Sequence, residues 1–166
     1  MADVSTVLDF GGACGQHYKQ ARLSAPDVRW AVVETPAMVA RANELSTPNL
    51  RFLTSVAGAK EWLRDIDLAY SSRALQYTSD PESKIAELCE TSARPILWER
   101  LILSPNGTKS EKKFSLLGEN GPRLVRHFRR KAAKFNRVLP PVDRFIVVRG
   151  KYRLIDRGSD WFKFVK

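Results

Sequence analysis

The sequence is poor in cysteine and histidine. Its 166 residues contain two of each, and the two cysteines, Cys14 and Cys89, stand far apart. Isolated cysteines argue against a disulfide framework and a structural zinc site, and they are typical of proteins from a reducing compartment. We therefore expect no metal ion and a cytoplasmic location.

Long apolar runs are also missing. No hydrophobic stretch approaches the roughly 20 residues that cross a bilayer. The amino terminus, Met-Ala-Asp-Val-Ser-Thr, has neither the basic nor the apolar region of a secretory signal. With 43% hydrophobic and 28% charged residues, the sequence predicts a globular protein of one domain without a transmembrane segment.

The first part of the chain has no excess of positive charge. Residues 1–100 contain 11 Lys or Arg and 13 Asp or Glu, a net charge of −2, whereas residues 101–166 contain 17 and 5, a net charge of +12. This asymmetry predicts an anionic partner for the second part, such as nucleic acid, a phosphorylated substrate or an anionic membrane. A solvated basic face explains it equally well.

Apolar runs alternate with helix-compatible segments through the first part of the chain. Strands are predicted at 5–10, Arg29–Glu34, Leu50–Leu53, Asp67–Ser71 and Pro95–Leu103, and helices at Gln16–Ala25, Pro36–Leu45, Val56–Leu63 and from Pro81 to about Thr91. This alternation predicts a Rossmann-like, doubly wound α/β fold with a mostly parallel sheet. The carboxyl ends of the strands then share one edge, where a ligand would bind.

Within this single predicted domain, residues 1–103 form a cofactor-binding core and residues 104–166 a basic carboxyl-terminal part. The polar segment Ser104–Lys113 predicts a loop, and Pro122 to Asn136 predicts a basic helix with an approximate apolar stripe. Further strands are predicted at Arg144–Val148, Tyr152–Ile155 and, at an edge of the sheet, Trp161–Val165.

The most informative stretch is Val7 to Gly15. An apolar strand end is followed by Asp9, by Gly11, Gly12 and Gly15, and then by a helix. A strand, a glycine turn and a helix in this order let the backbone approach a ligand and direct helix amides toward it. Glycine suits the turn because a Cβ would block it.

A second signal comes 19 residues after Gly15, where the second predicted strand ends in Glu34. An acid at this place accepts hydrogen bonds from both hydroxyls of a ribose, so the two signals together indicate an adenosine-containing ligand. The glycine spacing is not the Gly-x-Gly-x-x-Gly of dinucleotide sites. Asp9 would repel a pyrophosphate and attract an ammonium and a sulfonium, which favours S-adenosylmethionine.

Asp9-x-Gly11-x-x-x-Gly15 followed by Glu34 resembles motifs I and II of class I S-adenosylmethionine-dependent methyltransferases. The longer pattern, Leu-Asp-Phe-Gly-Gly-x-x-Gly-x-x-Tyr, Trp-x-Val-Val-Glu-x-Pro and Leu-Gln-Tyr, is similar to one bacterial methyltransferase family over about residues 5–103. The resemblance implies a methyltransferase that acts on a small-molecule or saccharide acceptor. Ala13 departs from it, since methyltransferases usually have glycine there. No helix precedes the first strand, so we expect a version of the fold shortened at its amino terminus.

The predicted cofactor-binding residues lie at the carboxyl ends of strands: Asp9, Gly11, Gly12, Gly15, Glu34, Thr54 and Ser71. Asp9 would hold the methionine ammonium, and Thr54 and Ser55 would border the adenine. Ser71 and Ser72 stand where methyltransferases place residues that face the transferable methyl. Asp9, the three glycines and Glu34 also have plain structural explanations, as a strand-end cap, turn residues and a surface acid. The assignment of Thr54 and Ser55 rests on their position alone.

Two residues are candidates for catalysis. His17, beside the glycine turn, could act as a general base, and Tyr77, after the fourth strand, could wall the acceptor site. Methyl transfer requires above all that donor and acceptor are aligned and water is excluded. A surface histidine and a tyrosine packed on a helix are the alternatives.

Two other functions remain open. A nucleic-acid methyltransferase would bind phosphates with the basic segment Arg123–Arg137. A non-catalytic binding protein would have kept the fold and lost the cofactor. Ala13 would explain this, and so would two segments that look like degraded versions of the later motifs of the family, Leu117–Pro122 and Tyr152–Arg157.

Overall fold

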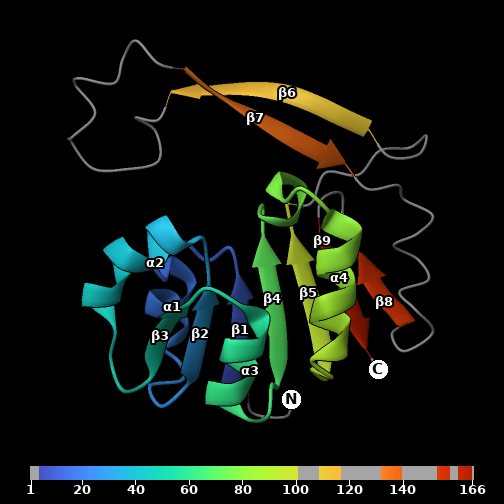
Figure 1. The fold of residues 1–166 in the computed structure, drawn as a ribbon. Coiled ribbons are helices and arrows are strands. Elements are labelled where there is room, and N and C mark those ends of the chain that lie inside the picture. The colour runs from blue at the N-terminus through green and yellow to red at the C-terminus, as the bar shows by residue number, and fades with distance from the viewer. Residues whose placement is uncertain (1–3, 101–108, 117–131, 140–152, 158–160, 166) are drawn as a thin grey trace.

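The computed structural model describes residues 4–100, 109–116, 132–139, 153–157 and 161–165 (Figure 1). In chain order its elements are β1 (Thr6–Phe10), α1 (Gln16–Ala21), β2 (Arg29–Val33), α2 (Pro36–Ala42), the 3₁₀ helix η1 (Asn43–Leu45), β3 (Leu50–Leu53), α3 (Val56–Leu63), β4 (Leu68–Ser72), the 3₁₀ helix η2 (Leu75–Tyr77), α4 (Pro81–Glu90), β5 (Pro95–Glu99), β6 (Lys109–Leu116), β7 (Ala132–Leu139), β8 (Arg153–Arg157) and β9 (Trp161–Val165).

Seven strands form one sheet in the order β3-β2-β1-β4-β5-β9-β8. Strands β1 to β5 run parallel to their neighbours, β9 is antiparallel to β5, and β8 is antiparallel to β9. The chain moves outward from β1 to β3 and then returns to place β4 beside β1. In such sheets ligands bind where the strand order reverses, outside the carboxyl ends of the strands. The predicted doubly wound, mostly parallel α/β fold is confirmed.

Each face of the sheet is covered by helices, so the central strands are buried on both sides. One core joins Val56 and Leu63 of α3 and Leu88 of α4 to Leu8 of β1. The opposite core contains Tyr18 of α1 and residues of β1 to β4. Parallel strands that are covered on both faces have continuous apolar runs in their sequence, and for this reason these strands could be predicted.

Three helices begin with a side-chain cap. Thr35 accepts a hydrogen bond from the amide of Met38, Ser55 from that of Gly58, and Asp80 from that of Ser83. These caps satisfy amides that have no partner within the helix. Each helix starts close to the carboxyl end of the preceding strand, so the caps also fix how the chain turns away from the upper edge in Figure 1.

Two predicted helices are too long. The helix predicted to reach Ala25 ends at Ala21, and residues 22–24 form turns in which Ser24 and Ala25 donate to the carbonyl of Ala21. Leu23 is 84% exposed, so an extra helical turn would bury no apolar face here. The helix predicted to reach Leu45 ends at Ala42 and continues only as η1.

The carboxyl-terminal part differs more from the prediction. Residues 109–113 were expected in a loop but belong to β6, and residues 132–136 were expected in a helix but belong to β7. These strands pair antiparallel, from Lys109 opposite Leu139 to Leu116 opposite Ala132. A helical stripe judged from local spacing cannot show that a distant segment will supply the hydrogen bonds of a strand.

Strand β8 agrees with the strand predicted at Tyr152–Ile155, and β9 with the one at Trp161–Val165. However, β9 lies between β5 and β8, so it is not the expected edge strand. Outside the described residues lie 101–108, 122–131 and Arg144–Val148, together with most of the basic segment Arg123–Arg137. Within the described residues, none of the helices combines the length and the apolar character needed to cross a membrane.

The turn after β1 gives a prediction for stability. Gly11 has a φ of +76°, and a Cβ added there would overlap the Cβ of Ala74. We expect Gly11→Ala to lower the free energy of unfolding by about 3 kcal/mol, from left-handed strain and the overlap together. Urea denaturation followed by circular dichroism measures this loss.

The double variant Gly11→Ala/Ala74→Gly is the control. It removes the overlap but not the strain, so we expect it to recover about half of the lost stability. Equal stability of the single and double variants would show that the turn does not pack against Ala74 in this way.

Candidate functional site

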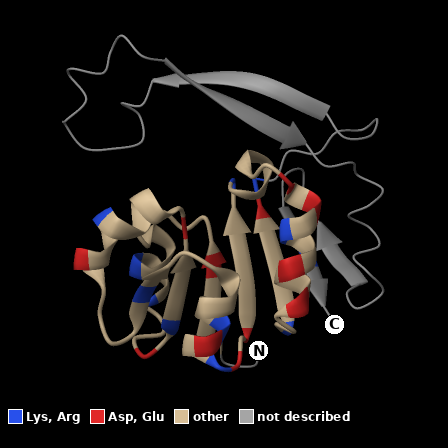
Figure 2. Cartoon of the chain, viewed as in Figure 1, with Lys and Arg blue, Asp and Glu red and all other residues tan. Residues whose placement is uncertain are grey.

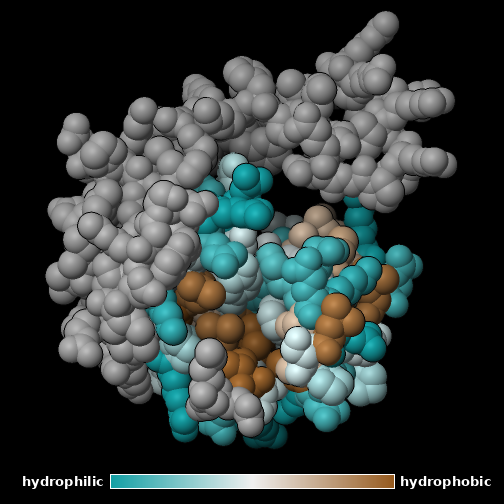
Figure 3. Space-filling model, turned by 180° about the vertical axis from the view of Figure 1, so that it is seen from behind, coloured by the Kyte–Doolittle hydropathy of each residue, from teal (hydrophilic) through white to brown (hydrophobic). Residues whose placement is uncertain are grey.

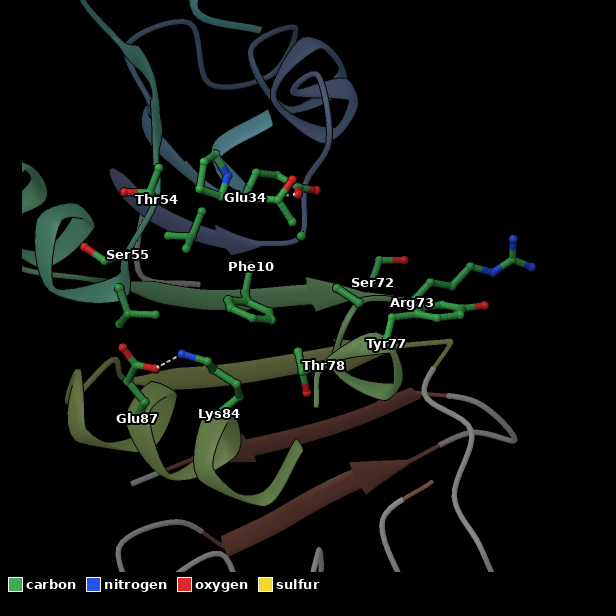
Figure 4. A pocket seen from close by; sticks show the side chains of 16 residues that line it. Phe10, Glu34, Thr54, Ser55, Ser72, Arg73, Tyr77, Thr78, Lys84 and Glu87 are labelled. Atoms are coloured by element: carbon green, nitrogen blue, oxygen red, sulfur yellow. Dashed lines mark hydrogen bonds and ion pairs between the residues drawn. The ribbon is translucent and has the colours of Figure 1, made fainter. Parts of the chain in front are cut away.

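A cleft of about 500 Å³ opens at the carboxyl edge of the sheet, within the range of small-molecule sites (Figure 4). Its walls come from the ends of β1 to β4 and from η2 and α4. The lining residues are Phe10, Gly11, Val33, Glu34, Thr35, Pro36, Thr54, Ser55, Val56, Ser72, Arg73, Ala74, Tyr77, Thr78, Lys84 and Glu87.

The cleft has two sides with Phe10 between them. Glu34, Thr54 and Ser55 lie toward one side, and Arg73 and Tyr77 lie toward the other (Figure 4). The first side is formed by the ends of β2 and β3, the second by the segment that follows β4. Six of the predicted residues therefore come together here, namely Gly11, Glu34, Thr54, Ser55, Ser72 and Tyr77.

Glu34 is held by two backbone amides. Its Oε1 accepts a hydrogen bond from the amide of Ala13 at 3.1 Å, and its Oε2 accepts one from the amide of Thr35 at 2.9 Å. The carboxylate is therefore fixed between the glycine turn and the end of β2. Each carboxylate oxygen can accept further hydrogen bonds, so this partly exposed side chain keeps accepting capacity toward the cleft.

The glycine turn is fastened to β2 as well. The amide of Gly11 donates to the carbonyl of Val33 at 2.8 Å, and that of Gly15 donates to the carbonyl of Gly12 at 3.0 Å. A Cβ on Gly12 would overlap the carboxylate of Asp9. Gly12 thus covers Asp9, while Gly15, at φ +74°, leads the chain into α1.

Asp9 is fully buried and does not line the cleft. Its Oδ2 accepts a hydrogen bond from Trp30 Nε1 at 3.1 Å and lies 3.3 Å from His17 Nδ1. Its Oδ1 has no hydrogen-bond partner among the described residues. The predicted contact between Asp9 and a methionine ammonium stays a prediction, and the buried oxygen without a partner is the atom available for it.

His17 lies on the α1 side of the edge, outside the lining of the cleft. The hydrogen bond to Asp9 is the main reason why the pKa of His17 is raised, and the charge of Glu99 adds to it, while burial and Arg100 oppose it. The ring meets Tyr70 edge-on, with 4.9 Å between centroids. Tyr70 donates to Glu99 Oε2 at 2.6 Å, and burial followed by this bond raises its pKa.

Ser71, predicted to face the transferable methyl, is 2% exposed, and its hydroxyl donates to the carbonyl of Phe10 at 2.9 Å. Ser72, predicted for the same place, does line the cleft. Asp9, Gly12, Gly15 and His17 likewise support the site without lining it.

Sequence reasoning missed several lining residues. Phe10 alternates with Asp9 along β1, so the two-residue period of a strand could have placed it on the opposite face. Lys84 and Glu87 come from α4 and form an ion pair at 2.6 Å. Their spacing gives an ordinary helix-surface pair, so nothing local could have assigned them to a cleft. In the described part of the chain, His, Cys, Asp and Glu form no cluster of three that could hold a metal.

The sequence matches no protein-family model, and a search of curated protein sequences finds no significant relative. Solved structures do resemble the chain. The sugar N-methyltransferase KedS8 from Streptoalloteichus sp. has a TM-score of 0.60 at 14% identity, over 98% of this chain and 80% of that one. CalS10, an amino pentose methyltransferase from Micromonospora echinaspora, has 0.59 at 12% identity, over 98% and 84%.

A third similar structure is a chain of the Haloferax volcanii complex that contains the Trm112 methyltransferase activator. Its TM-score is 0.59 at 15% identity, over 96% of this chain and 66% of that chain, so the present chain spans slightly less than two thirds of its length. Identities this low show the fold alone. The chain has the Rossmann-like fold found in these methyltransferase structures.

The pair formed by His17 and Asp9 predicts a pH dependence. Because the pKa of His17 is raised above 6.5, the pair stabilises the fold fully below pH 6.5, and this contribution is lost as the pH rises through the raised pKa. His127 is the only other histidine. An NMR titration of the two histidine rings should show the raised pKa for His17. The variant His17→Asn lacks the signals of this ring and so assigns them.

Asp9→Asn keeps an acceptor for Trp30 and removes the charge. We expect the pKa of His17 to fall in this variant, whereas the titration curve of His127 should be the same as in the wild type. An unchanged pKa of His17 would mean that the contact with Asp9 does not form in solution.

Proposed function

We propose that the protein is an S-adenosylmethionine-dependent methyltransferase and that the cleft binds the adenosine part of this cofactor. The observation that carries the proposal is the carboxylate of Glu34, which two backbone amides orient at the end of β2, beside the glycine turn. A fixed acceptor pair at this place suits the two hydroxyls of a ribose.

The residues present fit the cofactor in chemical terms. Phe10, Val33 and Val56 give the cleft apolar walls for an adenine, and Thr54 adds a hydroxyl at the end of β3. Behind the glycine turn, the buried Oδ1 of Asp9 has no partner among the described residues. A negative atom with free accepting capacity suits the ammonium of a methionine.

The cofactor would supply a methyl group activated by a sulfonium. The protein then has to align the acceptor with this group and exclude water. Tyr77, 51% exposed at the rim, would form a wall of the acceptor site. His17, whose ring Asp9 orients, would accept a proton from the acceptor. Of the two serines that the sequence assigned to the place beside the methyl, Ser72 would take it, because Ser72 lines the cleft and Ser71 does not.

We place the acceptor among small molecules and saccharides. The names of two similar structures, a sugar N-methyltransferase and an amino pentose methyltransferase, support this class. The exposed ring of Tyr77 supports it as well, because tyrosine offers an apolar face and a polar hydroxyl together. A bacterial origin and a cytoplasmic location remain part of the proposal.

The basic carboxyl-terminal part belongs to the same domain in this proposal. Strands β9 and β8 extend the sheet next to β5, which supports one domain over residues 1–166. The net charge of +12 in residues 101–166 supports an anionic partner there.

Glu34 provides the test. We expect calorimetry to detect micromolar binding of S-adenosylmethionine and S-adenosylhomocysteine by the wild type. Glu34→Ala should weaken it tenfold or more, about 1.4 kcal/mol, because both ribose hydroxyls lose their acceptor. Glu34→Gln keeps the size and some accepting capacity, so its loss should be smaller.

The matched control is Glu61→Gln, which neutralises an exposed acid on α3 away from the cleft. It should leave the affinity unchanged. If the folded wild type binds neither ligand at about 1 mM, the proposed methyltransferase activity is contradicted. A non-catalytic protein with this fold is then favoured.

A further inference from the structure

Two arginines directly follow neighbouring strands at the upper edge of the sheet. Ser72 of β4 pairs with Glu99 of β5, and Arg73 and Arg100 are the residues that follow. Adjacent strands lie about 4.8 Å apart, so the two side chains start from neighbouring points of the edge. Both arginines are exposed, and basic residues mark the upper ends of both strands in Figure 2.

The backbone holds both arginines in an uncommon conformation. Arg73 has a φ of +61° and Arg100 one of +53°. The amide of Arg73 donates to the carbonyl of Glu99 at 3.0 Å, and the buried Gln76 donates through Nε2 to the carbonyl of Arg100 at 3.2 Å. Left-handed φ values at residues other than glycine are costly, and they are concentrated at ligand sites.

The two guanidinium groups are available for a ligand. Within the part of the chain that the structure describes, neither forms an ion pair. The acids of this edge have other partners. Glu99 accepts from Tyr70, and Glu87 pairs with Lys84. Glu34 accepts from two backbone amides, and Asp9 is buried beside Trp30. Seen from behind, the described surface is hydrophilic near the upper edge, and hydrophobic residues gather lower down (Figure 3).

The pair also links the two parts of the proposed site. Arg73 lines the cleft and extends outward from its rim on the side of Tyr77 (Figure 4). The charge of Arg100 acts on His17, on the α1 side of the edge. A ligand held by both arginines would therefore lie at the rim of the cleft, on the side of Tyr77.

We infer that Arg73 and Arg100 bind an anionic group, a phosphate or a carboxylate, of the molecule that is methylated. Guanidinium groups bind both anions through paired N–H donors, so two of them on adjacent strands form a fork for one anion. This inference rests on the proposed function, because only a methyltransferase has a methyl acceptor. It narrows the acceptor class to small molecules that carry a phosphate or a carboxylate.

The test uses simple anions as probes on the full-length protein at low ionic strength, because salt screens exposed charges. Inorganic phosphate and pyrophosphate represent a phosphate group, and acetate and malonate represent a carboxylate. NMR signals of the arginine Nε–H groups report which side chains respond. We expect the signals of Arg73 and Arg100 to shift together and to saturate. The pair of probes that binds more tightly shows whether the anionic group is a phosphate or a carboxylate.

Three matched variants test the assignment. Arg73→Gly, Arg100→Gly and Arg64→Gly each remove an exposed arginine with positive φ, and glycine accepts this backbone without strain. Arg64 follows α3 and precedes β4, so it stands at the opposite edge of the sheet. All three should be at least as stable as the wild type. The variants at Arg73 and Arg100 should weaken the binding of the better probe tenfold or more, whereas Arg64→Gly should change it less than twofold.

An equal loss in all three variants, or no shift at Arg73 and Arg100 up to about 10 mM of every probe, would overturn the inference. Arg100→Gly and Arg64→Gly, which replace residues outside the lining of the cleft, should bind S-adenosylhomocysteine as the wild type does. If the wild type binds the anions but not S-adenosylhomocysteine, the anion site stands and the methyltransferase proposal fails.

Discussion

The site depends on the hydrogen bonds that fasten the turn after β1 to the end of β2. The amide of Gly11 reaches the carbonyl of Val33, and the amide of Ala13 reaches the carboxylate of Glu34. Parallel pairing of β1 and β2 brings these groups to the same height. The turn and the acid therefore fix one another, and the floor of the cleft is formed before any ligand arrives. Preorganisation of this kind lowers the cost of ordering the site when a ligand binds.

A second network stands behind the same turn, on the other face of the sheet. Asp9 joins the indole of Trp30 to the ring of His17, and Gly12 closes over its carboxylate. Asp9 and Phe10 are consecutive in β1 and so point to opposite faces, one into this network and one into the cleft. A single strand end thus connects the cleft, the buried side chain of Asp9 and the proposed proton acceptor.

The parts of this account that the sequence could predict are those set by local chemistry. Buried parallel strands give continuous apolar runs, glycines mark a turn that excludes a Cβ, and Glu34 stands at a strand end. Contacts that depend on the tertiary fold could not be predicted from the sequence. The burial of Asp9 depends on Trp30 and Gly12, and the two residues of α4 that line the cleft, Lys84 and Glu87, have only an ordinary surface pattern. Residues 132–136 form a strand because β6 pairs with them, a contact that local periodicity does not contain.

The most direct measurement is a crystal structure of the protein with S-adenosylhomocysteine. The account predicts that both ribose hydroxyls lie within hydrogen-bond distance, about 2.6–3.2 Å, of the Glu34 carboxylate, with the adenine between the ends of β2 and β3. A ligand bound elsewhere, or a ribose that does not contact Glu34 in an otherwise unchanged fold, would contradict the claim that this edge of the sheet is a methyltransferase site.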